Sequence, residues 1–150
     1  MPYRDLQDIL TLTAGWEKEL KDLYDVAEIA LRDEKSRKVV ALLRDNLVKN
    51  LAVLESVDVA KYGKMEWVRY AVDLRTEDII PKTKLKKDST PKEIFDQILE
   101  CEEKLKDFYS NIRDLLSSSE QQELFDSLVT FKVGQIIEIK SYMDSYDYMS

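Results

Sequence analysis

The sequence predicts an all-α fold: a four-helix bundle made of two repeated antiparallel helical hairpins joined by a long crossover. Three observations lead to this prediction. Apolar residues recur at steps of three and four over four long stretches, as the buried face of a helix requires. The 150 residues include only three glycines and three prolines, which favours long helices over a sheet with tight turns. Finally, a segment of the first half recurs, without a gap, 85 positions later.

The repeat is clearest between the segments WEKELKDLY at 16–24 and CEEKLKDFY at 101–109. Five residues recur unchanged: Glu17, Leu20, Lys21, Asp22 and Tyr24 match Glu102, Leu105, Lys106, Asp107 and Tyr109. A chain of this length suits one domain. We therefore expect a single domain over 1–150, with the first hairpin at about 4–57, the crossover at about 58–90 and the second hairpin at about 91–148.

The first hairpin is predicted from two apolar stripes. The first stripe predicts a helix whose inward residues are Leu6, Ile9, Leu10, Thr13, Trp16, Leu20, Leu23, Tyr24, Ala27 and Leu31. The second helix is expected from near Asp33 to about Val57, with Val39, Val40, Leu43, Leu47, Asn50, Leu51 and Leu54 inward. Only a few polar residues around 32–35 join the two stretches, which predicts an antiparallel pair.

The connection at 58–90 is too long for a simple turn. A short amphipathic helix is predicted within it from Met65, Trp67, Val68, Ala71, Val72 and Leu74. Pro81 and the lysines that follow it are typical of an exposed loop, with a docking patch for an acidic partner as the alternative; these lysines are Lys82, Lys84, Lys86 and Lys87. Residues 89–93 predict the start of the third helix, because a capping hydroxyl is followed by proline and an acid.

The second hairpin follows the same pattern. Inward residues of its first helix are Phe95, Ile98, Leu105, Tyr109 and Ile112. The serine run at 117–119, with Glu120, predicts the start of the last helix, whose inner side carries Leu124, Phe125, Leu128, Lys132, Gln135, Ile136 and Ile139. Tyr142 and Tyr146 are four positions apart and are expected to continue this helix, covering the end of the bundle or a dimer mate, or else forming a ligand-binding rim.

Charge and composition exclude several classes of function. The net charge of −7 argues against general binding to nucleic acid or to an anionic membrane, which needs a concentrated positive face. No apolar run approaches the roughly 20 residues of a membrane span, and the N-terminal residues lack the pattern of a signal peptide. We therefore expect a cytoplasmic protein. Cys101 is the only cysteine, so it is expected to be a packing residue or, alternatively, a redox thiol.

Glu17 and Glu102 stand at equivalent positions within apolar stripes, where an unpaired carboxylate is costly. Two antiparallel hairpins joined by one long crossover describe the ferritin-like bundle. Over nearly its whole length, and least well in the crossover, the chain resembles the rubrerythrin-like branch of the ferritin-like superfamily. In that family each first helix has a glutamate seven residues before an aromatic residue, as Glu17 and Tyr24, and Glu102 and Tyr109, are spaced here. The resemblance implies a di-iron carboxylate site at the bundle centre and a possible homodimer.

The second helix of each hairpin departs from the family pattern, which is Glu-x-x-His. Leu47 and Asn50 stand in these places in the first hairpin, and Lys132 and Gln135 stand in the second. The chain has no histidine, so only two of the six expected ligands remain. We therefore expect a degenerate site without metal. In this hypothesis the ammonium of Lys132 lies between the two glutamates, Asn50 and Gln135 donate further hydrogen bonds to them, and Leu47 fills space.

Two alternatives to this cluster stay open. Lys132 could extend to the surface, with the two glutamates at the edge of the bundle, or a metal site could survive at Glu17 and Glu102. The corresponding functions are a non-catalytic ferritin-like protein that serves as a binding or structural module, without cofactor, and a divergent iron-binding protein or oxidoreductase of the rubrerythrin type. Hydrolysis by the paired carboxylates is a third hypothesis. The sequence identifies no ligand or partner.

Overall fold

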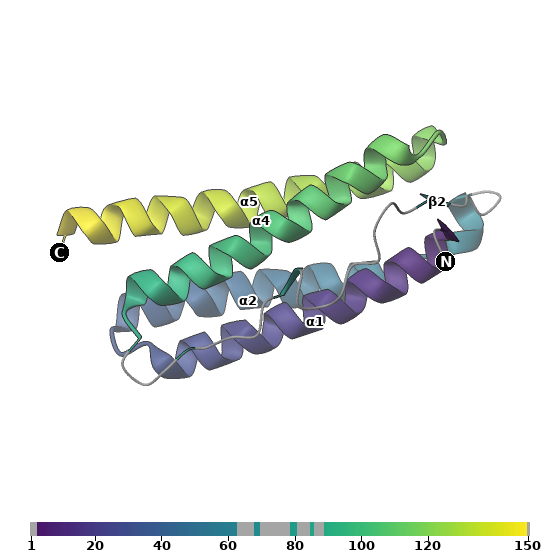
Figure 1. The fold of residues 1–150 in the computed structure, drawn as a ribbon. Coiled ribbons are helices and arrows are strands. Elements are labelled where there is room, and N and C mark those ends of the chain that lie inside the picture. The colour runs from purple at the N-terminus through teal and green to yellow at the C-terminus, as the bar shows by residue number, and fades with distance from the viewer. Residues whose placement is uncertain (1–2, 63–67, 70–78, 81–84, 86–88, 150) are drawn as a thin grey trace.

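The computed structural model describes residues 3–62, 68–69, 79–80, 85 and 89–149, and four long α-helices lie in these ranges (Figure 1). They are α1 (Leu6–Ala30), α2 (Glu34–Glu55), α4 (Pro91–Leu115) and α5 (Ser119–Met149). Helix α1 packs along α2 and α4 packs along α5, and the two hairpins then pack on each other. The prediction of an all-α fold with four long helices is confirmed.

Local sequence signals set where the helices begin. The side chains of Asp5 and Asp33 accept hydrogen bonds from backbone N–H groups in the first turns of α1 and α2. Thr90 and Glu93 form a reciprocal capping box at the start of α4, with Pro91 as its first residue. Helices α1 and α4 both contain 25 residues, and α4 begins and ends 85 positions after α1. Helix α5 also begins 85 positions after α2.

The crossover differs from its prediction. Its described part contains a short 3₁₀-helix η1 (Val59–Tyr62) and a two-residue strand β2 (Val68–Arg69), which pairs antiparallel with β1 (Tyr3–Arg4). Val68 was expected in an amphipathic helix, and this expectation is wrong because pairing with Arg4 holds the backbone extended. The other residues of that predicted helix, and the loop from Pro81 with its four lysines, lie outside the described residues. Helix α2 ends at Glu55, two residues before the predicted end.

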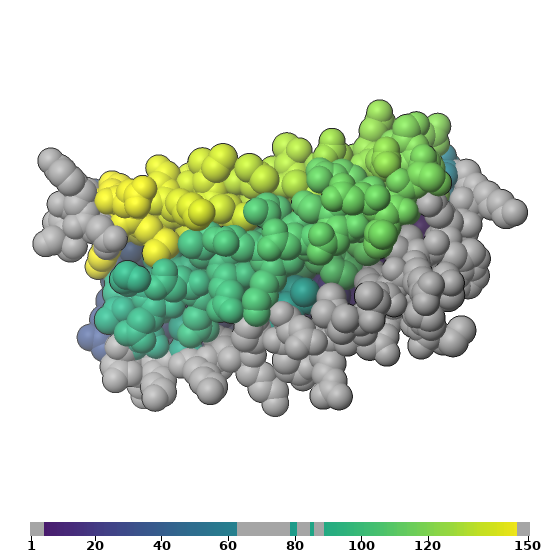
Figure 2. Space-filling model, turned by 45° about the horizontal axis from the view of Figure 1, so that its top comes forward, coloured from purple at the N-terminus to yellow at the C-terminus, as the bar shows by residue number. Residues whose placement is uncertain are grey.

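The core lies between the four helices and receives apolar side chains from each of them. On the face of the molecule that Figure 2 shows, α4 and α5 lie side by side. Ile79 and Ile80 from the crossover are also buried in the core. Cys101 is only 2% exposed, and burial raises the pKa of its thiol to about 12. A thiol in this state is a packing residue rather than a reactive thiolate.

Helix α5 has 31 residues, whereas α2 has 22. The C-terminal part of α5 extends to the end of the bundle at which α2 begins. The hydroxyl of Tyr142 lies 2.6 Å from the hydroxyl of Ser36 near the start of α2. The Tyr142 ring also contacts the rings of Phe95 and Tyr146, with centroids 5.2 and 6.0 Å away. The two tyrosines therefore continue the helix, and Tyr142 covers the bundle end, as predicted. None of the helices in the described ranges has the length and apolar character needed to cross a bilayer.

Candidate functional site

A cluster of three charged side chains lies at the centre of the bundle. Nζ of Lys132 on α5 is 2.5 Å from Oε1 of Glu17 on α1 and 2.7 Å from Oε1 of Glu102 on α4. All three residues are 0% exposed. The ion cluster expected from the sequence is therefore found, and an arrangement in which Lys132 extends to the surface is contradicted.

Two tyrosines complete the cluster by donating across the hairpins. Tyr24 on α1 donates a hydrogen bond of 2.9 Å to Oε2 of Glu102, and Tyr109 on α4 donates one of 2.6 Å to Oε2 of Glu17. Each of the four carboxylate oxygens therefore accepts one hydrogen bond from a side chain. This saturation is what makes a buried carboxylate tolerable, because charge-assisted hydrogen bonds replace those to water.

The two halves of the chain also differ at Thr13, on the buried face of α1. The hydroxyl of Thr13 is buried and donates a hydrogen bond to the carbonyl of Leu10. In the second half of the chain, Ile98 stands 85 positions after Thr13 and has no hydroxyl. This buried hydroxyl therefore has no counterpart in the second half of the chain.

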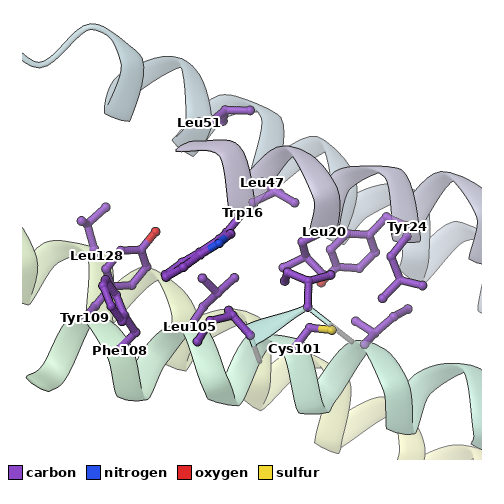
Figure 3. Close-up of a cluster of buried hydrophobic side chains, with 14 of the residues drawn as sticks. Trp16, Leu20, Tyr24, Leu47, Leu51, Cys101, Leu105, Phe108, Tyr109 and Leu128 are labelled. Atoms are coloured by element: carbon purple, nitrogen blue, oxygen red, sulfur yellow. The ribbon is translucent and has the colours of Figure 1, made fainter. Parts of the chain in front are cut away.

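Apolar and aromatic side chains exclude water from the cluster. Figure 3 shows part of this surrounding core, with Trp16, Leu20 and Tyr24 from α1, Leu47 and Leu51 from α2, and Cys101, Leu105, Phe108 and Tyr109 from α4. Trp16 and Phe108 meet edge to face, with ring centroids 4.8 Å apart. Nζ of Lys132 also lies 5.5 Å from the ring centroid of Phe131, within cation–π distance. The cluster thus sits in a medium of low polarity, where charges interact strongly.

The electrostatics of the cluster keep Lys132 charged as an ammonium and raise the pKa of Glu17. Burial alone would lower the pKa of Lys132, but Glu102 and Glu17 outweigh it and leave the pKa raised. Burial raises the pKa of Glu17, and the charge of Glu102 adds to this effect, although Lys132 opposes both. The pKa values of Tyr24 and Tyr109 are well above their ordinary range, because of burial and then the adjacent carboxylates. Both phenols are therefore held as hydrogen-bond donors.

Two of the predicted contacts are wrong. Nε2 of Gln135 does not donate to the glutamates but to the backbone carbonyl of Leu43, at 2.9 Å. Asn50 is half-buried, and its Nδ2 has no hydrogen-bond partner among the described residues. The physical reason is that the two tyrosines already supply the donors that the carboxylates need. Gln135 instead joins α5 to α2, while Leu47 is buried and fills space as expected.

The residues of the cluster do not fit a di-iron centre. Of the six positions at which the resemblance places ligands, only Glu17 and Glu102 carry a carboxylate, and an ammonium lies between them. Leu47 offers no ligand atom, and the amide of Gln135 is engaged elsewhere. In the described part of the chain, no three histidine, cysteine, aspartate or glutamate residues are grouped so that they could hold a metal ion.

Sequence reasoning missed the role of the two tyrosines. Both tyrosines are expected on the inward face, where their spacing from the glutamates supports the family resemblance. Their hydroxyls, however, donate to glutamates that lie 78 and 92 positions away in the chain. A usable signal was present, because both tyrosines lie seven residues after the glutamates, two helical turns along the same buried face. A polar aromatic residue that recurs on such a face needs a partner for its hydroxyl.

Removing either hydroxyl is expected to destabilise the fold. Tyr24→Phe and Tyr109→Phe each leave one buried carboxylate oxygen without a donor, which costs about 1–3 kcal/mol. Urea unfolding at neutral pH measures this loss. Tyr62→Phe is the control, because this side chain is only half-buried. Losses no larger than that of the control would mean that the tyrosines do not stabilise the cluster.

Comparison with protein-family models, with curated proteins and with solved structures finds no match to this chain.

Proposed function

We propose that this chain is a non-catalytic, ferritin-like protein of the rubrerythrin type, in which the ammonium of Lys132 has replaced the metal ions of a di-iron site. It serves as a binding or structural module and uses no iron. The observation that carries this proposal is the position of Lys132, within hydrogen-bond distance of both buried glutamates. A bound cation in that place would be repelled by the ammonium and would lack nitrogen ligands.

The helix bounds support descent from a duplicated hairpin. Helices α1 and α4 have equal lengths and are offset by 85 positions, the same offset that relates Glu17 to Glu102 and Leu47 to Lys132. Tyr24 of the first hairpin donates to Glu102 of the second, and Tyr109 of the second donates to Glu17 of the first, so each hairpin makes the same hydrogen bond to the other. A duplication explains why two buried glutamates face one another, because each hairpin contributed the same side chain.

The first test is metal analysis of the purified protein. Protein expressed in iron-supplemented medium and purified without chelator is expected to contain no stoichiometric iron and to show no ferric charge-transfer absorption. Its unfolding temperature is expected to be the same with and without a strong chelator, since no cation contributes to stability. About two irons per chain, or a large loss of stability in chelator, would contradict the proposal and favour the oxidoreductase.

The second test restores the missing ligands. The quadruple variant Leu47→Glu, Asn50→His, Lys132→Glu and Gln135→His is expected to bind ferrous iron, because these substitutions recreate two Glu-x-x-His pairs on facing helices. The matched control keeps Lys132 and carries only the other three substitutions, and it is expected to bind no iron. If the quadruple variant folds, as judged by circular dichroism, and binds no iron, the ferritin-like origin of the site is contradicted.

A further inference from the structure

A cavity of about 420 Å³ opens at the end of the bundle where α1 ends and where α2 and α4 begin (Figure 1). Its walls come from three parts of the chain: residues 30–33 between α1 and α2, Ser89 and Pro91 at the start of α4, and Tyr146 near the end of α5. The sequence allows a ligand-binding rim at Tyr146, and this residue lines the cavity. Cavities of this size hold small-molecule ligands in other proteins.

Two charges of opposite sign line the cavity at consecutive positions. Arg32 is exposed, and within the described ranges no carboxylate lies at ion-pair distance from its guanidinium. Oδ2 of Asp33 accepts hydrogen bonds from the backbone N–H of Ser36 at 2.9 Å and from the hydroxyl of Tyr142 at 3.5 Å. Over the same ranges, Oδ1 of Asp33 accepts none. One cation and one carboxylate oxygen are therefore left for a bound molecule.

In two other cavities on the surface, the basic side chain is already paired. Arg113 lines one of them and lies 2.8 Å from Asp126 and 3.2 Å from Asp114. Lys18 lines the other and lies 3.3 Å from Glu55, which lines the same cavity. The protein itself neutralises these two cations, so the cavity at the bundle end is the better candidate for a charged ligand.

The rest of the wall is apolar and aromatic. Ala30, Leu31 and Pro91 contribute aliphatic surface beside the two charges. The ring of Tyr146 packs on the ring of Tyr142, with centroids 6.0 Å apart, and a ring held in this way can pack against a further aromatic ring. A ligand that fills the cavity therefore needs an apolar body next to its charged groups, and an aromatic body fits best.

We propose that this cavity binds a free α-amino acid with an aromatic side chain. Its carboxylate pairs with the guanidinium of Arg32 and its ammonium pairs with the carboxylate of Asp33. Its side chain packs against Leu31 and the ring of Tyr146. The two charges of an α-amino acid are attached to one carbon atom, which suits two charges on neighbouring residues. A simple anion or cation would satisfy only one of them. The inference concerns the bundle end and does not depend on the buried cluster.

L-Phenylalanine is the probe for the experiment. The cavity is open to water and the ligand is small, so we expect a dissociation constant on the order of 0.1–1 mM. Titration of isotope-labelled protein, followed by two-dimensional NMR, measures this constant and also locates the site. The amide resonances of residues 30–33 and of Tyr146 are expected to shift and to reach saturation.

Two analogues of the probe test the two charges separately. Phenylpropionate lacks the ammonium and phenylethylamine lacks the carboxylate. Each is expected to bind at least about fivefold more weakly than phenylalanine, because one charged group of the cavity then loses its partner. L-Leucine keeps both charges but has no ring, and it is expected to bind roughly two- to tenfold more weakly.

Substitutions test the same contacts from the side of the protein. Arg32→Gln removes the cation, and Asp33→Asn removes the carboxylate but keeps a good helix cap, because asparagine caps helices as well as aspartate does. Each is expected to weaken phenylalanine binding at least about fivefold. Arg37→Gln is the matched control, since Arg37 is exposed on α2 and does not line the cavity; its binding should equal that of the wild type.

The outcomes are distinct. The absence of a saturable shift with phenylalanine up to about 20 mM overturns the proposal, and so does saturation at residues away from the cavity. Equal binding of phenylalanine and either analogue would mean that no paired charges are recognised. Binding that neither Arg32→Gln nor Asp33→Asn weakens would also contradict the proposal. Weaker binding in both variants, with unchanged circular dichroism and normal binding in Arg37→Gln, supports the amino-acid site.

Discussion

Lys132→Met is expected to lower the free energy of unfolding by about 3–5 kcal/mol at neutral pH, because it leaves two buried carboxylates without their counter-ion. Methionine keeps most of the volume and length of lysine, so this variant removes the charge with little change in packing. Lys132→Ala is expected to lose at least as much, since it also creates a cavity. Urea unfolding followed by circular dichroism measures both losses.

Two controls separate the ion cluster from ordinary packing. Lys140→Met replaces a lysine whose side chain is 59% exposed and is expected to change stability by less than about 0.5 kcal/mol. In a Glu17→Gln/Glu102→Gln background, Lys132→Met should cost much less than in the wild type, because no carboxylates remain to be neutralised. A loss below about 1 kcal/mol for Lys132→Met in the wild type would mean that the charges are solvated and that the cluster is not buried.

The second large effect is expected in the dependence of stability on pH. Burial and the charge of Glu102 raise the pKa of Glu17 from its ordinary value of 4.5. The folded protein therefore keeps a proton that the unfolded chain releases above about that pH. The contribution of Glu17 to stability is then greatest at and below this ordinary value, and it falls as the pH rises toward the folded pKa, by up to about 1.4 kcal/mol per pH unit. The raised pKa values of Lys132, Tyr24 and Tyr109 act in the same direction above about pH 10.

Glu17→Gln is the variant that tests this expectation, because glutamine resembles a protonated carboxyl and does not titrate. Its unfolding free energy should lose the decline that the wild type shows above pH 4.5, so the two curves should diverge as the pH rises. Glu19→Gln, which replaces an exposed carboxylate on the same helix, should leave the slope of the wild type unchanged. Equal slopes for the wild type and Glu17→Gln would show that Glu17 holds no extra proton.

Features that depend on residues close together in the chain could be predicted from the sequence. The starts of the helices follow from Asp33, Thr90 and Pro91, which cap or open a helix by local hydrogen bonds. The inward position of Lys132 follows from its place on an apolar stripe, and the offset between the two hairpins aligned it with Leu47. The ion cluster was therefore within reach of a sequence argument, since a buried charge requires an opposite one nearby.

Features that depend on distant pairing could not be predicted in the same way. The strand at Val68 exists because it pairs with Arg4, more than 60 positions away, and helical periodicity carries no information about that pairing. Gln135 turns to a backbone carbonyl of α2 because the tyrosines already occupy the glutamates, which only the packed hairpins reveal. In both cases the conformation is decided by a partner that is distant in the sequence, and not by the residues nearby in the chain.

Anomalous diffraction is the most direct test of the claim that a lysine ammonium stands where bound cations once stood. Crystals grown with ferrous iron, measured above and below the iron absorption edge, should show no anomalous peak between Glu17 and Glu102, and the electron density there should be that of the Lys132 side chain in contact with both carboxylates. A strong anomalous peak at that position, with Lys132 turned away from the two glutamates, would contradict the account.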